Sequence, residues 1–321
     1  TPPYSRVLSS YPLSLGDGLK IKFPNCIYSS EVHGKETIVV LALSPLTSNG
    51  FGQLGRFAKT DFAHASLVVK YLAKLHALSF VLQETKPGVF NDIRKFYDKD
   101  VQYSDGHRVS KSIETCYMTS VSVVSNTVAK AQLKELAPDV MNVLHKCTLP
   151  ASHNAICHGD CWNNNVMFKY GRRPVDNVLV DYQLSRLASP VTDLSYYFYM
   201  STERDFLQKH YDQLLNIYYG TLTAVLRYCD LDISDIYPKN VFERHLKIYS
   251  VLGLVEALIA MKIITADYDT ASEMVEKISS DETKIFESPP RNEFYVDRVN
   301  GIVDDFFSRG YSLCAVLNQI V

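Results

Sequence analysis

Three polar residues in one stretch of the sequence have the types and the spacing that magnesium-assisted phosphoryl transfer requires. Asp160 and Asn165 stand in a D-x-x-x-x-N relation, which places both in one loop, and Asp181 follows a short run of apolar residues. In this chemistry one carboxylate orients the acceptor hydroxyl and takes its proton, while an Asn and a second Asp hold the magnesium ions. The stretch therefore predicts the centre of a phosphotransferase.

A predicted β-hairpin must bring the last of these residues back to the others. Apolar residues alternate over 166–170, Gly171–Pro174 predicts a turn, and an apolar run over 178–180 ends at Asp181. The return strand would carry Asp181 beside Asn165. Each polar residue alone would be an ordinary turn or cap residue. The three together in a hairpin frame favour catalysis, because a motif gains weight from its structural context.

These motifs resemble the kinase fold shared by aminoglycoside phosphotransferases and choline kinases. The resemblance rests on His158-Gly159-Asp160 with Asn165, on Val180-Asp181 and on Ser189–Leu194. Within that group, two segments most resemble the ecdysteroid kinase-like family, also called CHK kinase-like. They are Trp162–Phe168 and Asp181–Arg186. The resemblance extends from about Phe23 to the end of the chain and is most specific at its centre.

The resemblance implies a fold and a reaction. The fold would be α+β, a protein-kinase-like fold of two lobes with a truncated N-terminal β lobe and a mainly helical C-terminal lobe. Residues 1–43 would be the remnant of the small lobe with the hinge strand, and residues 44–321 the large lobe with the catalytic loop and the metal-binding hairpin. ATP and Mg²⁺ would be the cofactors, and the acceptor a hydroxyl of a steroid-like or xenobiotic small molecule. Tyr182-Gln183 after the metal Asp suits this small-molecule branch better than protein substrates.

The resemblance also assigns roles to single residues. Asp160 becomes the catalytic base, Asn165 and Asp181 become the magnesium ligands, and His158 becomes a residue that organises the loop. His158 is a catalytic candidate together with Asp160, although a purely structural donor is an equally good interpretation of this residue. Asp193 would be a buried structural acid.

The adenine edge is expected on the hinge strand. We place it near Val40, Leu41 and Leu43, where backbone groups would contact the nucleotide. The chain has no acidic pair there, which departs from the family pattern. Backbone contacts would make this departure matter less.

A kinase-type nucleotide site also needs a glycine-rich loop and a strand Lys paired with a helix Glu. Neither is visible upstream of Phe23, where Gly16 and Gly18 are the closely spaced glycines, and Lys20 and Lys22 are poor substitutes for the strand Lys. We expect the sequence to start partway through the small lobe of a working enzyme. The alternative is a pseudokinase that acts as a ligand-binding module because it cannot activate ATP.

Composition favours a soluble cytoplasmic enzyme. The chain has 321 residues, 46% of them hydrophobic, and a net charge of -2, which predicts a large core and no attraction to nucleic acid or acidic membranes. Its seven Cys form no repeated CxxC pattern, so neither a disulfide framework nor a zinc module is expected. Cys157 and Cys161 are better interpreted as apolar filler around the loop. The sequence leaves the oligomeric state open.

No secretory signal or membrane span is evident. The most apolar stretch, 248–261, contains Glu256 and is shorter than the ~20 residues that a span requires. Most of the chain reads as helical, with Asp61 capping a helix through Leu82. His76 and the aromatic run Tyr196–Tyr199 are expected in the core. Further helices are predicted over 132–144, 205–227, 242–264, 271–286 and 293–308.

Overall fold

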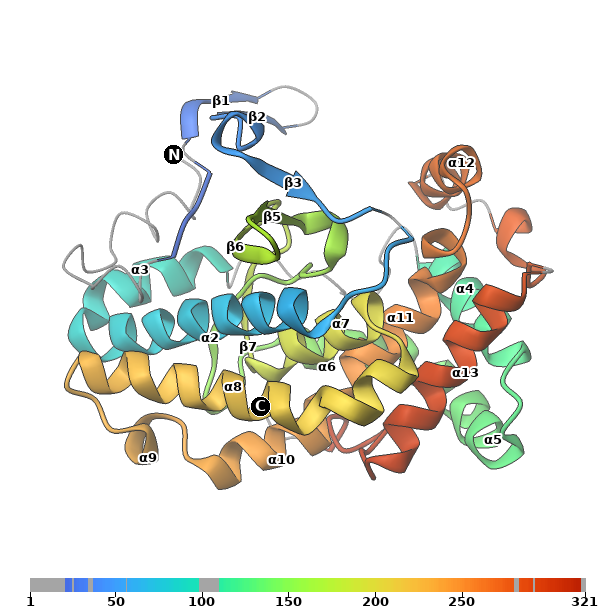
Figure 1. Ribbon diagram of the computed structural model, residues 1–321. Coiled ribbons are helices and arrows are strands. Elements are labelled where there is room, and N and C mark those ends of the chain that lie inside the picture. The colour runs from blue at the N-terminus through green and yellow to red at the C-terminus, as the bar shows by residue number, and fades with distance from the viewer. Residues whose placement is uncertain are drawn as a thin grey trace. The chain divides into compact units, whose positions relative to one another are not determined.

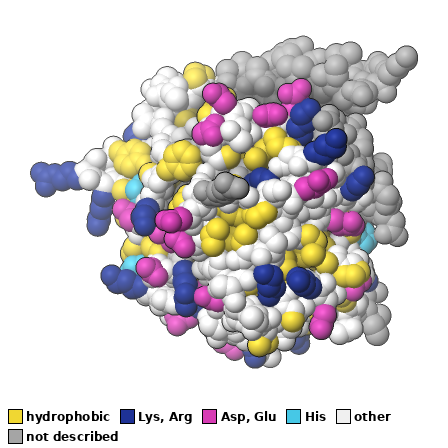
Figure 2. Space-filling view, turned by 90° about the vertical axis from the view of Figure 1, so that its right-hand side faces the viewer, with side chains coloured by type: hydrophobic (Ala, Val, Ile, Leu, Met, Phe, Trp, Pro, Cys, Tyr) yellow, Lys and Arg dark blue, Asp and Glu magenta, His cyan; other side chains and the backbone are white. Residues whose placement is uncertain are grey.

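The computed structural model describes residues 21–24, 26–33, 37–55, 57–97, 110–279, 283–290 and 292–318 (Figure 1). Within these ranges small β-sheets accompany a predominantly helical chain, which agrees with the predicted α+β class. On the face drawn in Figure 2, acidic and basic side chains are interspersed, as a net charge of -2 would suggest.

The chain forms two compact units, each assembled from separate segments. The first unit comprises Thr1–Asp100, Ala155–Leu187 and Asp212–Pro238, and the second comprises Val101–Asn154, Ala188–Tyr211 and Lys239–Val321. The candidate catalytic and magnesium residues all belong to the first unit. The predicted boundary after residue 43 concerns kinase lobes and stays a prediction.

The first unit contains most of the β-structure. Strands β1 (Cys26–His33) and β2 (Thr37–Leu43) form an antiparallel pair. Strands β3 (Phe51–Gln53), β5 (Val166–Tyr170) and β6 (Pro174–Leu179) form an antiparallel sheet in the order β3-β5-β6, and β4 (Ala155–Cys157) pairs with β7 (Arg186–Ala188). The β5–β6 register sets Val166 opposite Leu179, so the predicted hairpin is confirmed.

Helix α2 (Phe62–Thr85) lies in the first unit and packs against β4 and β6. The Asp61 side chain caps it as predicted, accepting the His64 N–H at 2.9 Å. By length and composition α2 is the one described helix that would suffice to cross a membrane, but 78% of its most apolar window is buried. The same unit contains α3 (Pro87–Tyr97), most of α8 (Arg204–Tyr228) and α9 (Ile233–Ile236), with 3₁₀ turns η1 (Thr47–Asn49) and η3 (Asn163–Asn165).

The described part of the second unit is helical. Its central helix α11 (Val251–Ile264) contacts α4 (Ser110–Ser122), α7 (Val191–Ser201) and α13 (Glu293–Ser308). The residues of α11 are mostly apolar and buried around the whole helix, because it lies inside this core. Around it lie α5 (Thr127–Leu136), α6 (Val140–Thr148), α10 (Lys239–Tyr249) and α12 (Tyr268–Ser279), with 3₁₀ turns η2 (Ala137–Asp139) and η4 (Lys284–Phe286).

Three predicted helices were wrong in extent. The helix over 132–144 is two helices, α5 and α6, separated by η2, because Pro138 lacks the N–H that a continuous helix needs. The helix over 242–264 breaks at Ser250 into α10 and α11. The helix over 271–286 already ends at Ser279 as α12. Helices predicted over 205–227 and 293–308 agree with α8 and α13.

Candidate active site

The loop that follows β4 carries His158, Gly159 and Asp160. Gly159 has a φ of +88°, in the left-handed region, and a Cβ at this position would lie 1.9 Å from the carbonyl oxygen of Leu184. Only glycine fits this position, because any side chain would collide with the backbone of the neighbouring loop. The close approach brings the loop of Asp160 against the segment that follows Asp181.

His158 links the two loops through its ring nitrogens. The ring is fully buried, and its Nε2 lies 3.0 Å from the carbonyl oxygen of Val180, to which it must donate. The Asp160 backbone N–H donates to Nδ1 at 3.2 Å. Both bonds hold only for the neutral ring with its proton on Nε2. His158 thus joins the residue before Asp181 to the backbone of Asp160.

Asn165 contacts Asp160 directly. Its Nδ2 donates to the Asp160 carboxylate oxygen Oδ2 at 2.8 Å and to the Asp160 carbonyl oxygen at 2.9 Å. Both partners are acceptors, so the orientation of the amide is fixed by chemistry. This orientation leaves Oδ1 as the oxygen of the Asn165 side chain that can bind a cation.

The hairpin returns the chain to Asn165 just before Asp181. The Val180 N–H donates to the Asn165 carbonyl oxygen at 2.9 Å. Asp181 itself has a φ of 64° and an exposed side chain, and the Gln183 amide donates to its Oδ2 at 3.3 Å. The structure therefore gathers Asp160, Asn165 and Asp181 in the first unit, joined by hydrogen bonds of the side chains and the backbone.

Two residues that the sequence did not single out hold the turn η3 in place. Thr60 accepts a hydrogen bond from the Asn163 amide at 2.9 Å, and the Gln53 amide donates to the Asn164 carbonyl oxygen at 2.8 Å. Both come from segments about one hundred residues upstream. No local pattern marks them, because both contacts exist only in the folded chain, where β3 pairs with β5 and brings Gln53 to the turn.

The model of the ecdysteroid kinase-like family matches residues 4–231, which is more than half of the chain. The chain belongs to the ecdysteroid kinase-like family. No curated protein matches it.

Two solved structures are similar to this family member at low identity. One is an ethanolamine kinase from Plasmodium vivax, with 12% identity and a TM-score of 0.38, covering 81% of this chain and 69% of that one. The other is a choline/ethanolamine kinase family protein from Mesorhizobium loti, with 15% identity and a TM-score of 0.35, covering 87% and 78%.

The side chains of the site fit a magnesium ion. The Asp181 carboxylate and the Asn165 Oδ1 are oxygen donors, and Mg²⁺ prefers one or two carboxylates with oxygen ligands completed by water and phosphate. Asn165 is buried, while Asp181 is exposed and accessible to a cation that carries its own water. In this family member the two residues would hold the ion that accompanies ATP.

The predicted adenine edge lies on β2, in a different sheet from the hairpin of Asp181. Val40 pairs with Ser30 and Leu41 with Ser29, so β1 occupies one edge of β2. The side chains of Val40, Leu41 and Leu43 lie outside the described residues. Nucleotide contact by the backbone of β2 stays a prediction.

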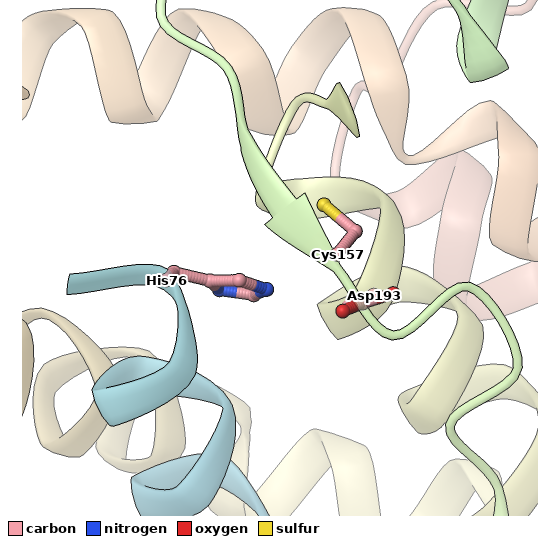
Figure 3. A group of neighbouring side chains, drawn as sticks. All are labelled: His76, Cys157 and Asp193. Carbon is pink, nitrogen blue, oxygen red and sulfur yellow. The ribbon is translucent and has the colours of Figure 1, made fainter. Parts of the chain in front are cut away.

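Two side chains in the core of the first unit lie close to each other. Figure 3 draws His76 on α2 and Cys157 on β4, whose ligand atoms lie within 4.8 Å of each other. His76 is fully buried, and its Nδ1 hydrogen bonds to the Tyr218 hydroxyl at 2.8 Å, as a packed core histidine would. Asp193 is likewise fully buried, in α7, and the aromatic run Tyr196–Tyr199 lies in the core of the second unit.

Proposed function

We propose that this family member is an ATP- and Mg²⁺-dependent phosphotransferase of the two-lobed kinase type that phosphorylates a hydroxyl of a small molecule. One observation carries the proposal. The side-chain amide of Asn165 donates to the Asp160 carboxylate, and the backbone carbonyl oxygen of Asn165 accepts the N–H of Val180, which directly precedes Asp181. A base and two oxygen ligands for magnesium are thereby held together by one loop and one hairpin.

The reaction uses these residues in distinct ways. Mg·ATP, when bound, supplies the phosphoryl group and neutralises the charge that builds up during its transfer. Asn165, through Oδ1, and Asp181, through its carboxylate, would hold the cation. Asp160 orients the acceptor hydroxyl, whose oxygen forms the new bond to the γ-phosphorus while the bond to ADP breaks. The hydroxyl proton passes to the Asp160 carboxylate and then to solvent.

The acceptor that we propose is an ecdysteroid, another steroid-like alcohol or a xenobiotic alcohol. Membership of the ecdysteroid kinase-like family supports this class. A hydroxyl on a rigid, largely apolar body would bind by burial of its apolar surface, with few polar contacts fixing its orientation. The proposal places the enzyme in the cytoplasm, where ATP is available.

Calorimetric titration with ATP, with and without Mg²⁺, tests the first half of the proposal. Asp181→Ala should lose the Mg²⁺-dependent part of the binding. Asp160→Asn should keep Mg·ATP binding, because Asp160 is no metal ligand in this assignment. Asp235→Asn is the control, since Asp235 lies exposed on α9 and makes the same change of charge away from the site.

Phosphate transfer from labelled ATP to a panel of alcohols that includes an ecdysteroid tests the second half. Asp160→Asn should abolish transfer, and Asp235→Asn should leave it unchanged. Binding of Mg·ATP without transfer to any alcohol would favour the ligand-binding module over the kinase. A folded chain that binds no ATP at any Mg²⁺ concentration would overturn the proposal.

A further inference from the structure

We infer that Tyr182 is a positioning residue that holds Asp181 in its magnesium-binding conformation, anchored by Tyr71, His158 and Phe23. The inference rests on the proposed function, because it assigns Tyr182 a part in holding the same cation. It adds a determinant of magnesium affinity that lies outside the three residues of the catalytic motif.

Asp181 needs to be held, because its backbone is in the left-handed region. A φ of 64° is uncommon outside glycine, and although Asp tolerates it better than most residues, the hydrogen bonds of its neighbours help to keep it there. On the N-terminal side, Val180 is fixed by its N–H to Asn165 and by its carbonyl oxygen to His158. On the C-terminal side, the Tyr182 carbonyl oxygen accepts the Ser185 N–H at 3.1 Å and the Ser185 hydroxyl at 2.7 Å.

The side chain of Tyr182 is clamped between rings from distant segments of the same unit. Its ring centroid lies 4.4 Å from that of His158 and 5.7 Å from that of Phe23. Phe23 also contacts Tyr71 edge-on, with centroids 6.3 Å apart. Because His158 bonds to Val180 as well, the ring contact links both neighbours of Asp181 to one buried imidazole.

A chain of hydrogen bonds completes the anchor. The Tyr71 hydroxyl donates to the Lys22 carbonyl oxygen at 2.7 Å, which uses its single proton. The Tyr182 hydroxyl, 3.0 Å away, must therefore donate to the Tyr71 oxygen. Because the hydrogen bonds run from Tyr182 to Tyr71 and from Tyr71 to Lys22, two variants differ in effect. Tyr182→Phe removes one bond, whereas Tyr71→Phe removes two: its own bond to Lys22 and the bond that it accepts from Tyr182.

Placement matters more for magnesium than for most cations. Mg²⁺ requires near-ideal octahedral geometry, so a carboxylate that is not held in one position binds it poorly. Asp181 is exposed, and its side chain accepts a long hydrogen bond from the Gln183 amide at 3.3 Å. Its position thus depends on its flanking residues, among which Tyr182 alone has a large side chain packed in the unit.

The test compares the Mg²⁺ dependence of ATP binding in the full chain and in single variants. Tyr182→Ala should raise the Mg²⁺ concentration for half-maximal binding about tenfold, Tyr71→Phe about fivefold, and Tyr182→Phe, which loses only one bond, about twofold. Mg²⁺-free ATP binding should not change. Tyr170→Phe is the matched control, since its hydroxyl bonds to His64 at 3.1 Å and makes no contact with the anchor. An unchanged Mg²⁺ dependence in folded Tyr182→Ala would overturn the inference, as would equal losses with and without Mg²⁺.

Amide hydrogen exchange of residues 180–186, measured without ATP or Mg²⁺, tests the inference separately from the proposed function. The Ser185 amide reports on Tyr182, because it donates to the Tyr182 carbonyl oxygen. Exchange there should be faster in Tyr182→Ala than in the parent and in Tyr170→Phe. If the parent binds no Mg·ATP, the proposed function fails while this exchange still decides whether Tyr182 orders the loop. Unchanged exchange would then overturn the inference.

Discussion

The amide of Asn165 donates one N–H to the carboxylate of Asp160 at 2.8 Å and the other to the carbonyl oxygen of the same residue at 2.9 Å. Asn165→Asp would lose both donors and set a second negative charge beside the first, and like charges this close repel each other. We expect phosphate transfer to fall about 100-fold or more, because the proposed base, Asp160, would be displaced from its productive position. Transfer from labelled ATP to an alcohol measures the effect.

Asn164→Asp is the control for this prediction. It adds the same charge in the same turn, where the backbone carbonyl oxygen and not the side chain bonds to Gln53. Transfer should remain within a few-fold of the parent. Equal losses in both variants would mean that any added charge in the turn impairs the enzyme, and would contradict the specific role of Asn165.

Gly159→Ala should destabilise the chain and impair the loop of Asp160. A methyl group at this position would meet the Leu184 carbonyl oxygen at 1.9 Å, and the φ of +88° disfavours alanine as well. The loss in free energy of unfolding should exceed about 1 kcal/mol, measured by urea denaturation. Gly220→Ala is the control, because this exposed helix position has no atom within 4 Å and should gain roughly 0.5–1 kcal/mol. If Gly159→Ala changed the free energy of unfolding no more than Gly220→Ala does, the close approach of the two loops would be contradicted.

Sequence patterns predicted the parts of the site that depend on near neighbours. The hairpin over β5 and β6 followed from alternating apolar residues and a turn, and the cap at Asp61 from a polar residue before a helix. The capping hydrogen bonds also affect the ionisation of the Asp61 carboxylate. Burial raises the pKa of Asp61, but hydrogen bonds from the backbone and ring of His64 outweigh it and hold the pKa below its ordinary value.

The parts that depend on tertiary contact left no such signal. The bond between Tyr71 and Tyr182 joins residues that are 111 positions apart, and no local period predicts it. The break at Ser250 was also missed, because apolar residues continue through it from α10 into α11. Pro138 did carry a local signal, since proline interrupts a helix, and the prediction over 132–144 neglected it.

Arg298 caps the C-terminal end of α7, and its replacement should destabilise the second unit. Its guanidinium donates to the carbonyl oxygens of Tyr199 at 3.0 Å, Met200 at 3.3 Å and Thr202. Burial lowers the pKa of Arg298 to about 10, with Glu203 opposing this effect, so the group stays charged at neutral pH.

Arg298→Met should lower the free energy of unfolding by about 3 kcal/mol, because buried carbonyl groups would lose a charged donor. Arg298→Lys keeps the charge but not the planar fork, and should lose less. Urea denaturation compares the two. A lysine variant as unstable as the methionine variant would show that the fork, rather than the charge at the helix end, provides the stabilisation.

His245 should make the stability of the chain depend on pH. It is 2% exposed, hydrogen bonds to the Ser189 hydroxyl through Nδ1 at 2.8 Å, and lies beside His153, with ring centroids 6.3 Å apart. Burial first, and then the charges of His153 and Arg244, lower the pKa of His245 to about 3. The folded chain therefore keeps this ring neutral where the unfolded chain protonates it.

The sign of the effect follows from this difference. The stabilisation is fully present above the unfolded pKa of about 6.5 and is lost as the pH falls towards the folded value, by up to about 1.4 kcal/mol per pH unit. Urea denaturation at about pH 7.5, 6 and 5 measures this slope. His245→Asn retains a polar atom near Nδ1 without the titration, so its stability should fall less steeply over the same range. Parallel slopes in the two chains would mean that other groups account for the acid sensitivity.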